Sequence, residues 1–431
     1  MFSNKLSHLA SLMRNEKKSI DELIYSQQTK LKSLLSHAYR NVPLYRKKFQ
    51  DSGFEPGDVK SIDDIHKIPI TSKDDFHAHD IRDCIDQHVR SFKALIPIKT
   101  SGSSGQALQF FIDQEYDQFR KAQCLRPYLT NGQRPFDRTI TFTGHPRNRK
   151  KLHEYLFLFR DRQISAHLSS DVHVEYLEQM QPEVVRGYPS VLALLGTTIL
   201  NSHVSIKPPR CVFTDSELLT SSERNTIETA FSQQVIDIYG TLETDNIAYE
   251  CEMHSGYHIA MDCVIMEFVR DGRTVEPGRH GEIICTVLNN YAMPFIRYKI
   301  NDTALYSADE CSCGRTFPLM KSFQGRVHDF AVTKTGQYIS STSILAKLDE
   351  FAPFVKAYQI IQCDVDSFQL RLIPGNQFFS SFKNQIESRM KKLFPDAEMD
   401  IICCDQLLQE SSGKVMPFKS LVHNKEQIFQ E

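Results

Sequence analysis

A loop of hydroxyl-bearing residues and glycines near residue 100 could bind phosphate. Its residues are Thr100, Ser101, Gly102, Ser103, Ser104 and Gly105. Backbone N–H groups and side-chain hydroxyls packed this densely can surround phosphate oxygens. The next residue is Gln, so the loop lacks the Gly-Lys-Ser/Thr ending of a P-loop. By itself, such a sequence is also typical of a plain linker.

A carboxylate follows a predicted apolar strand at 235–239. The segment reads Tyr239, Gly240, Thr241, Leu242 and Glu243. In open α/β sheets, ligands bind beyond the carboxyl ends of the strands, where this turn would lie. Carboxylate oxygens are the ligands that Mg²⁺ prefers, so Glu243 could hold Mg²⁺ beside a nucleotide. The alternative is an ordinary turn with a solvated Glu.

Three further charged residues could complete such a site. Asp302, which ends the run RYKIND, could accept hydrogen bonds from two ribose hydroxyls, or could form a surface ion pair. Arg326 follows Gly325 and could contact a nucleotide, or could belong to a simple interdomain turn. Lys414 stands on a Gly-containing loop, where its charge could neutralise phosphate oxygens during attack by a carboxylate. It could equally be one of many surface lysines.

Three thiols and an imidazole could form a tetrahedral Zn²⁺ site. Cys311 and Cys313 are separated by one residue, and Cys251 lies 60 residues before Cys311. His254 and His258 both follow Cys251, and we favour His258 as the fourth ligand. With four protein ligands the ion would be structural rather than catalytic. The alternative is a group of reduced cysteines near a turn.

The elements that must position these residues follow an α/β pattern. Short apolar runs at 138–143, 183–187, 210–214 and 235–239 alternate with helical stretches. The last hundred residues combine strand-like alternation with one apolar helical face, as expected for a small α+β domain. We therefore predict an α/β fold with a large amino-terminal domain at 1–326 and a small carboxyl-terminal domain at 327–431.

The amino-terminal region is predicted to be helical. Apolar residues at 31, 34, 35 and 38 follow the spacing of one helical face. Pro43 should end that helix.

Composition excludes several classes of protein. The 431 residues include 51 Lys+Arg and 53 Asp+Glu, which argues against a nucleic-acid-binding surface spread over the whole protein. No apolar run is long enough for a membrane span, and no apolar signal core follows Met1. Several of the 11 cysteines stand alone in apolar runs, so we expect a cytoplasmic protein without disulfides.

The order and spacing of these segments resemble those of the adenylate-forming superfamily. The similarity is greatest to its phenylacetate–CoA ligase and CapK (coenzyme F390 synthetase) branch. Five further segments carry the resemblance: LLSHAYRNVPLYR at 34–46, IPITSK at 68–73, RGYPS at 186–190, YEC at 249–251 and CSCGRT at 311–316. The resemblance implies a large multi-sheet adenylation domain and a small, mobile α+β lid domain at the carboxyl terminus.

The resemblance also implies a role for each candidate residue. The loop 100–105 would hold the β- and γ-phosphates of ATP. Ser216 and Glu217 would line the adenine pocket, and Tyr239 would pack on the adenine. Glu243 would bind Mg²⁺ and Asp302 the ribose hydroxyls. Arg326 would support ribose or phosphate, and Lys414 would be the adenylation lysine.

Three positions depart from the pattern of this family. Gln106 stands where the family usually has Lys after the phosphate loop. Leu242 stands where Ser or Thr commonly precedes the Mg²⁺-binding Glu. The pair His328–Asp329 stands where the hinge has two Asp residues.

The implied reaction has two steps. A carboxylate attacks the α-phosphate of ATP, which gives acyl-AMP and pyrophosphate. The small domain then rotates about 326–329, and an acceptor thiol, expected to be coenzyme A, takes the acyl group. The basic run at 145–151 could meet the phosphates of coenzyme A, or could be a solvated loop.

The acid and the acceptor are less defined than the reaction type. By resemblance, the acid is an aryl or small hydrophobic carboxylate, and the family often forms homodimers. An amine, a hydroxyl or a carrier-protein thiol could replace coenzyme A. The remaining alternative is a non-catalytic relative that only binds nucleotide.

Overall fold

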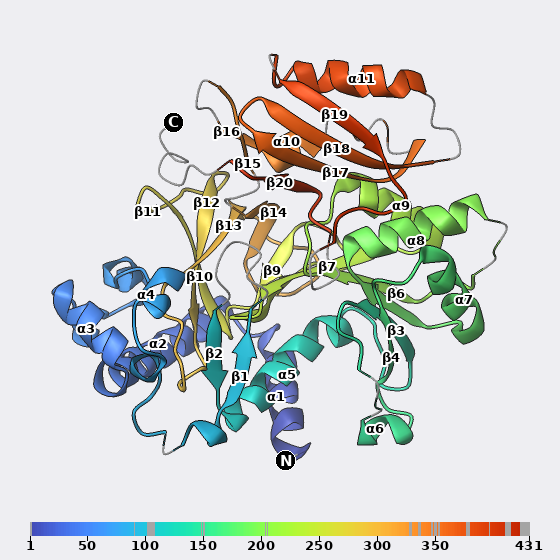
Figure 1. The fold of residues 1–431 in the computed structure, drawn as a ribbon. Coiled ribbons are helices and arrows are strands. Elements are labelled where there is room, and N and C mark those ends of the chain that lie inside the picture. Colours follow the sequence, from blue (N-terminus) through green and yellow to red (C-terminus); the bar gives the residue numbers. More distant parts are fainter. Residues whose placement is uncertain are drawn as a thin grey trace. The chain divides into compact units, whose positions relative to one another are not determined.

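The protein forms two compact units, each built from two stretches of chain. Figure 1 labels the helices and strands of both stretches. The first unit contains 1–131 and 238–323, and the second contains 132–237 and 324–431. The computed structural model describes residues 2–89, 91–100, 108–147, 149, 151–202, 204, 206–326, 330–334, 338–345, 348, 351, 354–375, 380–395, 397–409 and 415–422. The division into domains at residue 326 stays a prediction.

Helices make up most of the first stretch of the first unit. They include α1 (Phe2–Asn15), α2 (Ile20–Asn41), α3 (Pro43–Asp51), α4 (Lys73–His77) and α5 (Gln114–Thr130). The predicted apolar face of α2 is confirmed, since Leu31, Leu34, Leu35 and Ala38 are all buried. The predicted helix end is also confirmed, because α2 stops at Asn41 and Pro43 opens α3. No helix of the described residues has the length and apolar character that crossing a bilayer requires.

The strands of the first unit pair antiparallel. They are β1 (Ile96–Lys99), β2 (Gln109–Ile112), the end of β7 (Val235–Thr241), β8 (Asp245–Tyr249), β9 (Tyr257–Ile259), β10 (Val264–Arg270), β11 (Arg273–Thr274), β12 (His280–Val287), β13 (Tyr298–Ser307) and most of β14 (Leu319–Arg326). β8 pairs with both β7 and β9, and β12 pairs with both β10 and β13. One core joins α2 and α3 to this β-rich region through residues such as Phe49 and Phe295.

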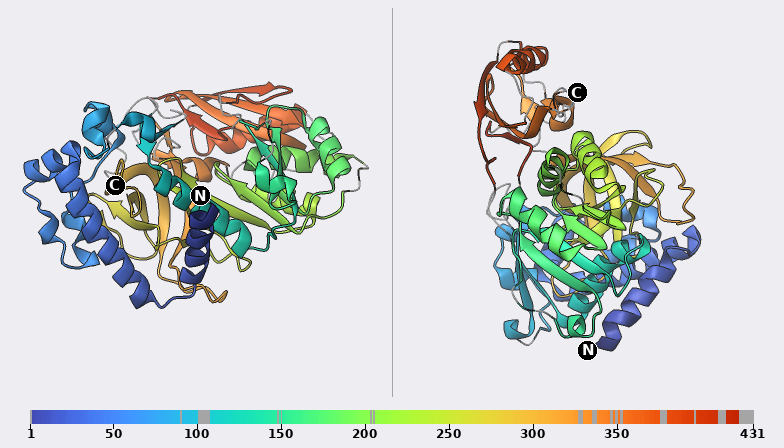
Figure 2. Two further views of the ribbon diagram at one scale, coloured as in Figure 1. Left: turned by 90° about the horizontal axis from the view of Figure 1, so that it is seen from below. Right: turned by 90° about the vertical axis from the view of Figure 1, so that its right-hand side faces the viewer.

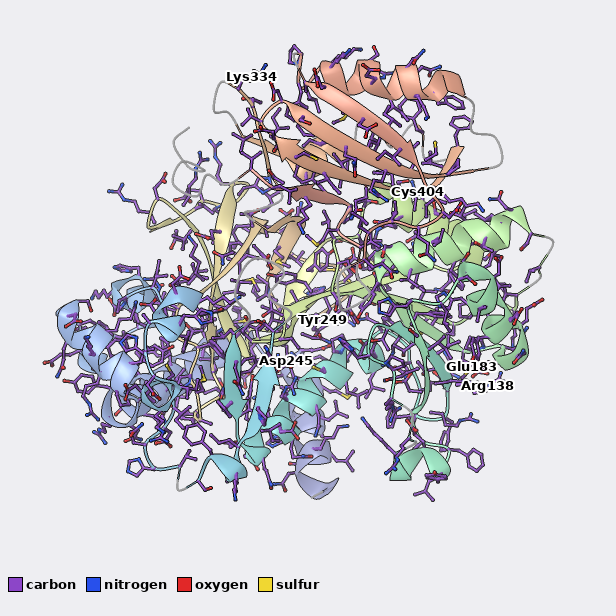
Figure 3. All side chains as sticks on the ribbon, viewed as in Figure 1. Arg138, Glu183, Asp245, Tyr249, Lys334 and Cys404 are labelled. Carbon is purple, nitrogen blue, oxygen red and sulfur yellow. The ribbon has the colours of Figure 1, made fainter. Side chains whose placement is uncertain are left out.

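Helix α5 fixes the turn between β7 and β8. The Arg120 guanidinium binds the Asp245 carboxylate, with 2.9 Å between Nη2 and Oδ1. Gln123 Nε2 donates to the carbonyls of Thr244 and Asn246 at 3.1 and 3.0 Å. Asp245, labelled in Figure 3, has a φ of 58°, a conformation that non-glycine residues rarely adopt. The turn that carries Glu243 is therefore held from one side by two side chains of α5.

The amino-terminal stretch of the second unit confirms the predicted alternation of strands and helices. Its elements are β3 (Arg138–Thr143), α6 (Leu152–Tyr155), β4 (Arg160–Ser165), α7 (Ser170–Met180), β5 (Val184–Gly187), α8 (Pro189–Asn201), β6 (Cys211–Asp215) and α9 (Ser221–Phe231). β3 pairs in parallel with β4 and β5, and β5 pairs in parallel with β6. Arg138 and Glu183, labelled in Figure 3, form an ion pair of 2.6 Å at the amino ends of β3 and β5.

The carboxyl-terminal stretch of the second unit has its own sheet and core. Its elements are β15 (Phe330–Val332), β16 (Tyr338–Ser340), α10 (Ser341–Leu345), β17 (Val355–Asp364), β18 (Ser367–Pro374), α11 (Ser380–Lys391), β19 (Glu398–Cys403) and β20 (Phe418–Ser420). Strands β19, β18, β17 and β20 form one four-stranded sheet in that order. Helix α11 covers one face of this sheet (Figure 2), and its Ile386 and Met390 belong to the same apolar core as Phe368 and Leu370 of β18.

Gly240 is expected to be essential for the turn that carries Glu243. A Cβ at this position would lie 2.0 Å from the Asp245 carbonyl oxygen and 2.9 Å from the Asn246 Cα. Both are backbone atoms, so the strand pair would have to separate, and overpacking of this kind costs about 1–3 kcal/mol or more. We predict that Gly240→Ala lowers the unfolding temperature by several degrees in a thermal melt.

Gly57→Ala is the matched control for this prediction. A Cβ at Gly57 would meet no atom within 4 Å. Its φ also lies outside the left-handed region, so the substitution should leave the melt unchanged. Equal melts for the two variants would show that the turn is not constrained as the contacts indicate.

Candidate active site and candidate metal centre

Tyr239 and Asp302, 63 residues apart in sequence, meet in the first unit. The Tyr239 hydroxyl donates a hydrogen bond to Asp302 Oδ2 at 2.8 Å. Both side chains are buried, on β7 and β13 respectively. The structure thus joins the residue predicted to pack on adenine to the residue predicted to bind ribose.

Glu243 lies two residues beyond the end of β7 and is half-buried. The Tyr298 hydroxyl is 3.4 Å from Glu243 Oε1 and donates to it. Burial, together with the adjacent Glu243 carboxylate, raises the pKa of Tyr298 above its usual range, so the phenol stays protonated and remains a donor. A carboxylate held in this way offers the oxygen ligands that Mg²⁺ requires.

The strand that carries Asp302 is joined to the IPITSK segment. Thr71 N donates to the Arg297 carbonyl at 2.9 Å, and Lys299 N donates to the Thr71 carbonyl at 2.8 Å. Arg297 itself forms a buried ion pair with Glu267, with Nη2 and Oε1 2.8 Å apart. This guanidinium therefore has a structural partner and supports the strand that carries Asp302.

Glu217 receives two backbone hydrogen bonds in the second unit. Ser190 N donates to Glu217 Oε2 at 3.1 Å, and Val415 N donates to Oε1 at 2.9 Å. Val415 directly follows Lys414 in the chain. Burial raises the pKa of the Glu217 carboxyl to about 7 despite these donors. The neighbouring Ser216 is exposed, has a φ of 70° and donates from Oγ to Asp215 Oδ1 at 2.7 Å.

The residues on either side of 410–414 are held by side chains from elsewhere in the second unit. Gln409 and Val415 form an antiparallel bridge. Gln359 Nε2 on β17 donates to the carbonyls of Leu408 and Met416 at 3.2 and 2.9 Å. His167 Nδ1 lies 2.8 Å from Gln409 Oε1. These contacts hold the described residues on both sides of the segment 410–414, which contains Lys414.

Several residues predicted for the site lie outside the described residues. They are Ser101–Gly105, Lys414 and the pair His328–Asp329. Arg326 ends β14, and nothing is described of its side chain. Of the phosphate loop, Thr100 is described, and its Oγ1 accepts a bond from Leu108 N at 2.9 Å. Thr241 Oγ1 lies 3.1 Å from Thr244 Oγ1, within the turn that carries Glu243.

Cys251, His258, Cys311 and Cys313 come together in the first unit. One ligand atom from each residue lies within 4.8 Å of the ligand atoms of the other three. The Sγ atoms of Cys251 and Cys311 are 3.6 Å apart, and Cys313 Sγ is 3.3 Å from His258 Nε2. All eleven cysteines are described, and each is a free thiol. His254 stands outside this group, with Nδ1 3.6 Å from Glu250 Oε2.

The surroundings prepare the four residues for a soft divalent cation. His258 Nδ1 is 3.2 Å from the Phe317 carbonyl, which fixes the tautomer that leaves Nε2 free to face the thiols. Burial lowers the pKa of His258 to about 4, so the ring is neutral, as a ligand must be. Three sulfurs and one imidazole nitrogen form a donor set typical of tetrahedral Zn²⁺. The residues therefore fit the predicted ion.

Glu16 connects this cysteine cluster to the amino-terminal helices. Arg315, two residues after Cys313, donates from Nε to Glu16 Oε2 at 3.1 Å. Thr316 N donates to the Glu16 carbonyl at 3.1 Å. Arg126 on α5 is fully buried, and its Nε lies 3.8 Å from Glu16 Oε1. The segment after α1 is thus attached both to the cysteine cluster and to α5.

Known proteins resemble the chain over most of its length. Over 361 residues, 80% of this chain and 80% of the relative, the sequence is 27% identical to phenylacetate–coenzyme A ligase of Escherichia coli (strain K12). Protein CapK of Staphylococcus aureus is 23% identical over 389 residues, 86% of this chain and 82% of CapK. A crystal structure of 2-hydroxyisobutyryl-CoA ligase, in the postadenylation state with R3-HIB-AMP, has a TM-score of 0.78 at 20% identity and covers 97% of this chain and 92% of that chain. No family model matches the sequence.

These relatives confirm the predicted resemblance to the adenylate-forming superfamily. Within it, the similarity is to the phenylacetate–CoA ligase and CapK branch, as the sequence motifs predicted. The structural neighbour confirms the predicted mixed α/β fold of adenylate-forming enzymes. The roles of individual residues stay predictions.

Several residues make contacts that sequence analysis missed. Arg120, Gln123 and Asp245 hold the turn before β8, and Glu217 binds the backbone beside Lys414. Arg120 and Asp245 are 125 residues apart in sequence. The backbone donors to Glu217 are 27 and 198 residues away from it. Local sequence patterns cannot predict contacts over such separations. The sequence did show acidic residues just after two predicted strands, the one at 210–214 and the one at 235–239.

The raised pKa of Glu217 predicts a pH-dependent stability. The carboxyl keeps its proton up to about pH 7 in the folded protein, whereas the unfolded chain releases it near pH 4.5. Ionisation therefore favours unfolding increasingly as pH rises between these values. In Glu217→Gln the amide oxygen can accept one of the two backbone bonds, an NH2 group replaces the other oxygen, and no charge forms, so any cost of the lost bond is the same at every pH. Thermal melts should show the variant gaining stability relative to wild type from about pH 5 to pH 7.

Glu183→Gln is a control of opposite sign. The hydrogen bonds from Arg138 outweigh burial and lower the pKa of Glu183 to about 2. Its contribution is present above pH 4.5 and is lost as pH falls toward 2, so this variant should be less stable than wild type at pH 7 and equal to it near pH 2. A Glu217→Gln variant whose stability follows wild type at every pH would contradict the burial of that charge. The charged and titratable neighbours of Glu217 include Glu223 on α9, Tyr188 and Asp215, and all three are retained in both variants.

Proposed function

We propose that the protein is an ATP-dependent ligase that converts a carboxylic acid to an acyl-AMP and then to a coenzyme A thioester. The observation that carries this proposal is the similarity, over 80% of the chain, to a phenylacetate–coenzyme A ligase. The contact of Tyr239 with Asp302 and the position of Glu243 after β7 agree with it. An aryl or small hydrophobic acid is the proposed substrate class, and a cytoplasmic location and a homodimer are part of the same proposal.

The first step needs positive charge around the α-phosphate. The acid attacks that phosphorus, so negative charge increases on its oxygens in the transition state. In our proposal, Lys414 approaches these oxygens, and Thr100–Gly105 bind the β- and γ-phosphates. Glu243 would hold Mg²⁺, which neutralises phosphate charge when it is bound. Asp302 and Tyr239 would fix the nucleoside, so that the phosphorus is presented in one orientation.

The second step needs the lysine to be exchanged for a thiol. We propose that the carboxyl-terminal domain, 327–431, turns about 326–329, which removes Lys414 and admits coenzyme A. The contact between Glu217 and the Val415 backbone would hold the lysine-bearing segment during the first step. This contact between Glu217 and Val415 would then break when the domain rotates.

A different acceptor is the second candidate. In this second candidate the acyl group passes to an amine, a hydroxyl or a carrier-protein thiol, and the similarity to CapK as well as to coenzyme A ligases keeps it open. The adenylation step is common to both candidates. An assay of that step alone therefore tests the activity before the acceptor is known.

The central test is carboxylate-dependent exchange between ATP and pyrophosphate. The panel would contain aryl acids such as phenylacetate and small acids such as 2-hydroxyisobutyrate. We predict that Lys414→Ala lowers this exchange by roughly 10²–10³, the range for removal of one electrostatic contact in the transition state. Thioester formation from a synthetic acyl-AMP should change much less, because the lysine has then left the site. Both half-reactions would be followed by chromatography.

Lys419→Ala is the matched control, since Lys419 is exposed on β20, five residues after Lys414. It should retain both half-reactions. Equal losses in both half-reactions of Lys414→Ala would indicate general damage to the fold. Unchanged exchange would remove Lys414 from the mechanism, and no exchange with any acid would favour a relative that only binds nucleotide.

We also propose that Cys251, His258, Cys311 and Cys313 hold one structural Zn²⁺. Four protein ligands leave no open position, so the ion would stabilise the fold and take no part in the reaction. The attachment of Arg315 to Glu16 extends this stabilisation to the segment after α1. Metal analysis should find about one zinc per chain.

Cys311→Ser is predicted to lose the zinc and to lower the unfolding temperature, because binding energy at a structural site is folding energy. Cys363→Ser is the control, since Cys363 is exposed and belongs to the second unit. It should keep both the metal and the melt of the wild type. A wild type that contains no zinc and is insensitive to chelators would refute the site.

A further inference from the structure

Four large apolar side chains are strongly exposed around α6. Phe136, Tyr155, Leu156 and Phe157 have exposed fractions of 66%, 65%, 66% and 64%. Phe136 precedes β3, and the other three end α6 or follow it (Figure 1). Single exposed apolar residues are ordinary, but a contiguous group indicates an interaction surface.

Arg160 joins these residues into one surface. Its Nη2 donates to the Phe136 carbonyl at 2.8 Å, and its guanidinium carbon lies 5.5 Å from the centroid of the Phe157 ring. Phe159 N donates to the Pro135 carbonyl at 2.5 Å. The two loops that carry Phe136 and Phe157 are therefore bound to each other.

The backbone of this loop is constrained as well. Phe157 and Phe159 have φ angles of 59° and 47°, which bulky residues rarely adopt. In this conformation the Phe157 ring remains mostly in solvent.

The surrounding sequence is strongly basic. Between 145 and 162 there are six Lys or Arg and only two Asp or Glu, although the whole chain has a net charge of −2. Arg147 contacts both acidic residues of this stretch, Glu154 and Asp161. Arg149 and Lys151 are exposed on the segment that leads into α6. We call Phe136, Tyr155, Leu156, Phe157, Arg149, Lys151 and Arg160 the basic–aromatic patch.

The apolar part of this patch lies at the edge of the parallel sheet that is opposite to Glu217. Phe136 and Phe157 precede β3 and β4, so they lie at the amino ends of these strands. Glu217 follows β6, which runs parallel to β5 and thus to β3, so it lies beyond the carboxyl ends. A partner on the aromatic residues would leave Glu217 and the segment bound to it uncovered.

We propose that the basic–aromatic patch docks the protein on the surface of an anionic phospholipid membrane. Aromatic and aliphatic side chains at a protruding loop enter the boundary between headgroups and acyl chains, where Tyr and Phe are favoured. Lys and Arg beside them are attracted by the negative surface potential. A second copy of the chain fits less well, because a two-fold interface would bring the same basic residues face to face.

Sedimentation with vesicles tests the proposal on the full-length protein. Vesicles of phosphatidylcholine with phosphatidylglycerol should bind the protein, and vesicles of phosphatidylcholine alone should bind it weakly. Raising the salt concentration should weaken the binding, since exposed charges are screened. The double variant Leu156→Ser with Phe157→Asn should bind at least about tenfold more weakly, because two apolar side chains no longer enter the lipid. Asn is chosen at 157 because it tolerates a positive φ.

Two further variants separate the contributions. Arg149→Glu should weaken binding and reduce its dependence on salt. Leu200→Ser is the matched control, since Leu200 is 51% exposed on α8, outside the patch, and its loss should leave binding unchanged. Thermal melts verify folding, and Tyr155→Ser replaces the double variant if that variant unfolds.

Three results would overturn the proposal. One is the absence of binding to the anionic vesicles. Another is equal binding by wild type and by the double variant. The third is a wild type that binds no vesicles and is a dimer in light scattering, while the double variant is a monomer. That result would assign the patch to contact with a second copy of the chain.

Discussion

The contact between Arg120 and Asp245 determines where the candidate site can form. Asp245 is almost completely buried, and burial raises the pKa of its carboxyl even though Arg120 is adjacent. A pair of this kind contributes little net stability, because removing two charges from water offsets their attraction. Its effect is to hold residues 240–246 in the observed conformation, together with the two carbonyls bound by Gln123 and the left-handed backbone of Asp245. That conformation brings Gly240 against the opposite strand and sets the direction in which Glu243 leaves β7.

A second buried arginine links the same helix to the cysteine cluster. Arg126 binds Asp262 and lies 3.8 Å from Glu16, which in turn binds Arg315 beside Cys313. Breaking a buried ion pair leaves an uncompensated charge, which typically costs 3–5 kcal/mol. The residues that would hold zinc therefore belong to the same network as the helix that holds the turn carrying Glu243. Metal at this cluster would act on the site through Glu16 and α5 rather than through any contact with substrate.

The local elements of this fold could be predicted from the sequence, but the contacts that assemble the site could not. The periodicity of α2 and the apolar runs of β3 and β6 are properties of neighbouring residues, so they are visible without a structure. The group of Cys251, His258, Cys311 and Cys313 was also predictable, because few residue types bind zinc and their number restricts the choices. The bond from Val415 to Glu217 was not, since it joins residues 198 positions apart through a backbone N–H that every residue except proline possesses. The roles of residues in the phosphate loop depend on resemblance alone.

The parallel strands of the second unit separate two kinds of surface. In such a sheet all strands end at the same edge, and ligands bind beyond their carboxyl ends. Residues at the amino ends can therefore have other roles. Here the carboxyl end of β6 leads to Glu217, whose carboxylate needs burial and fixed donors. The amino ends of β3 and β4 carry aromatic side chains that remain exposed, held together by Arg160. In our proposal a membrane would contact the amino ends of β3 and β4, so Glu217, beyond the carboxyl end of β6, would stay outside that contact.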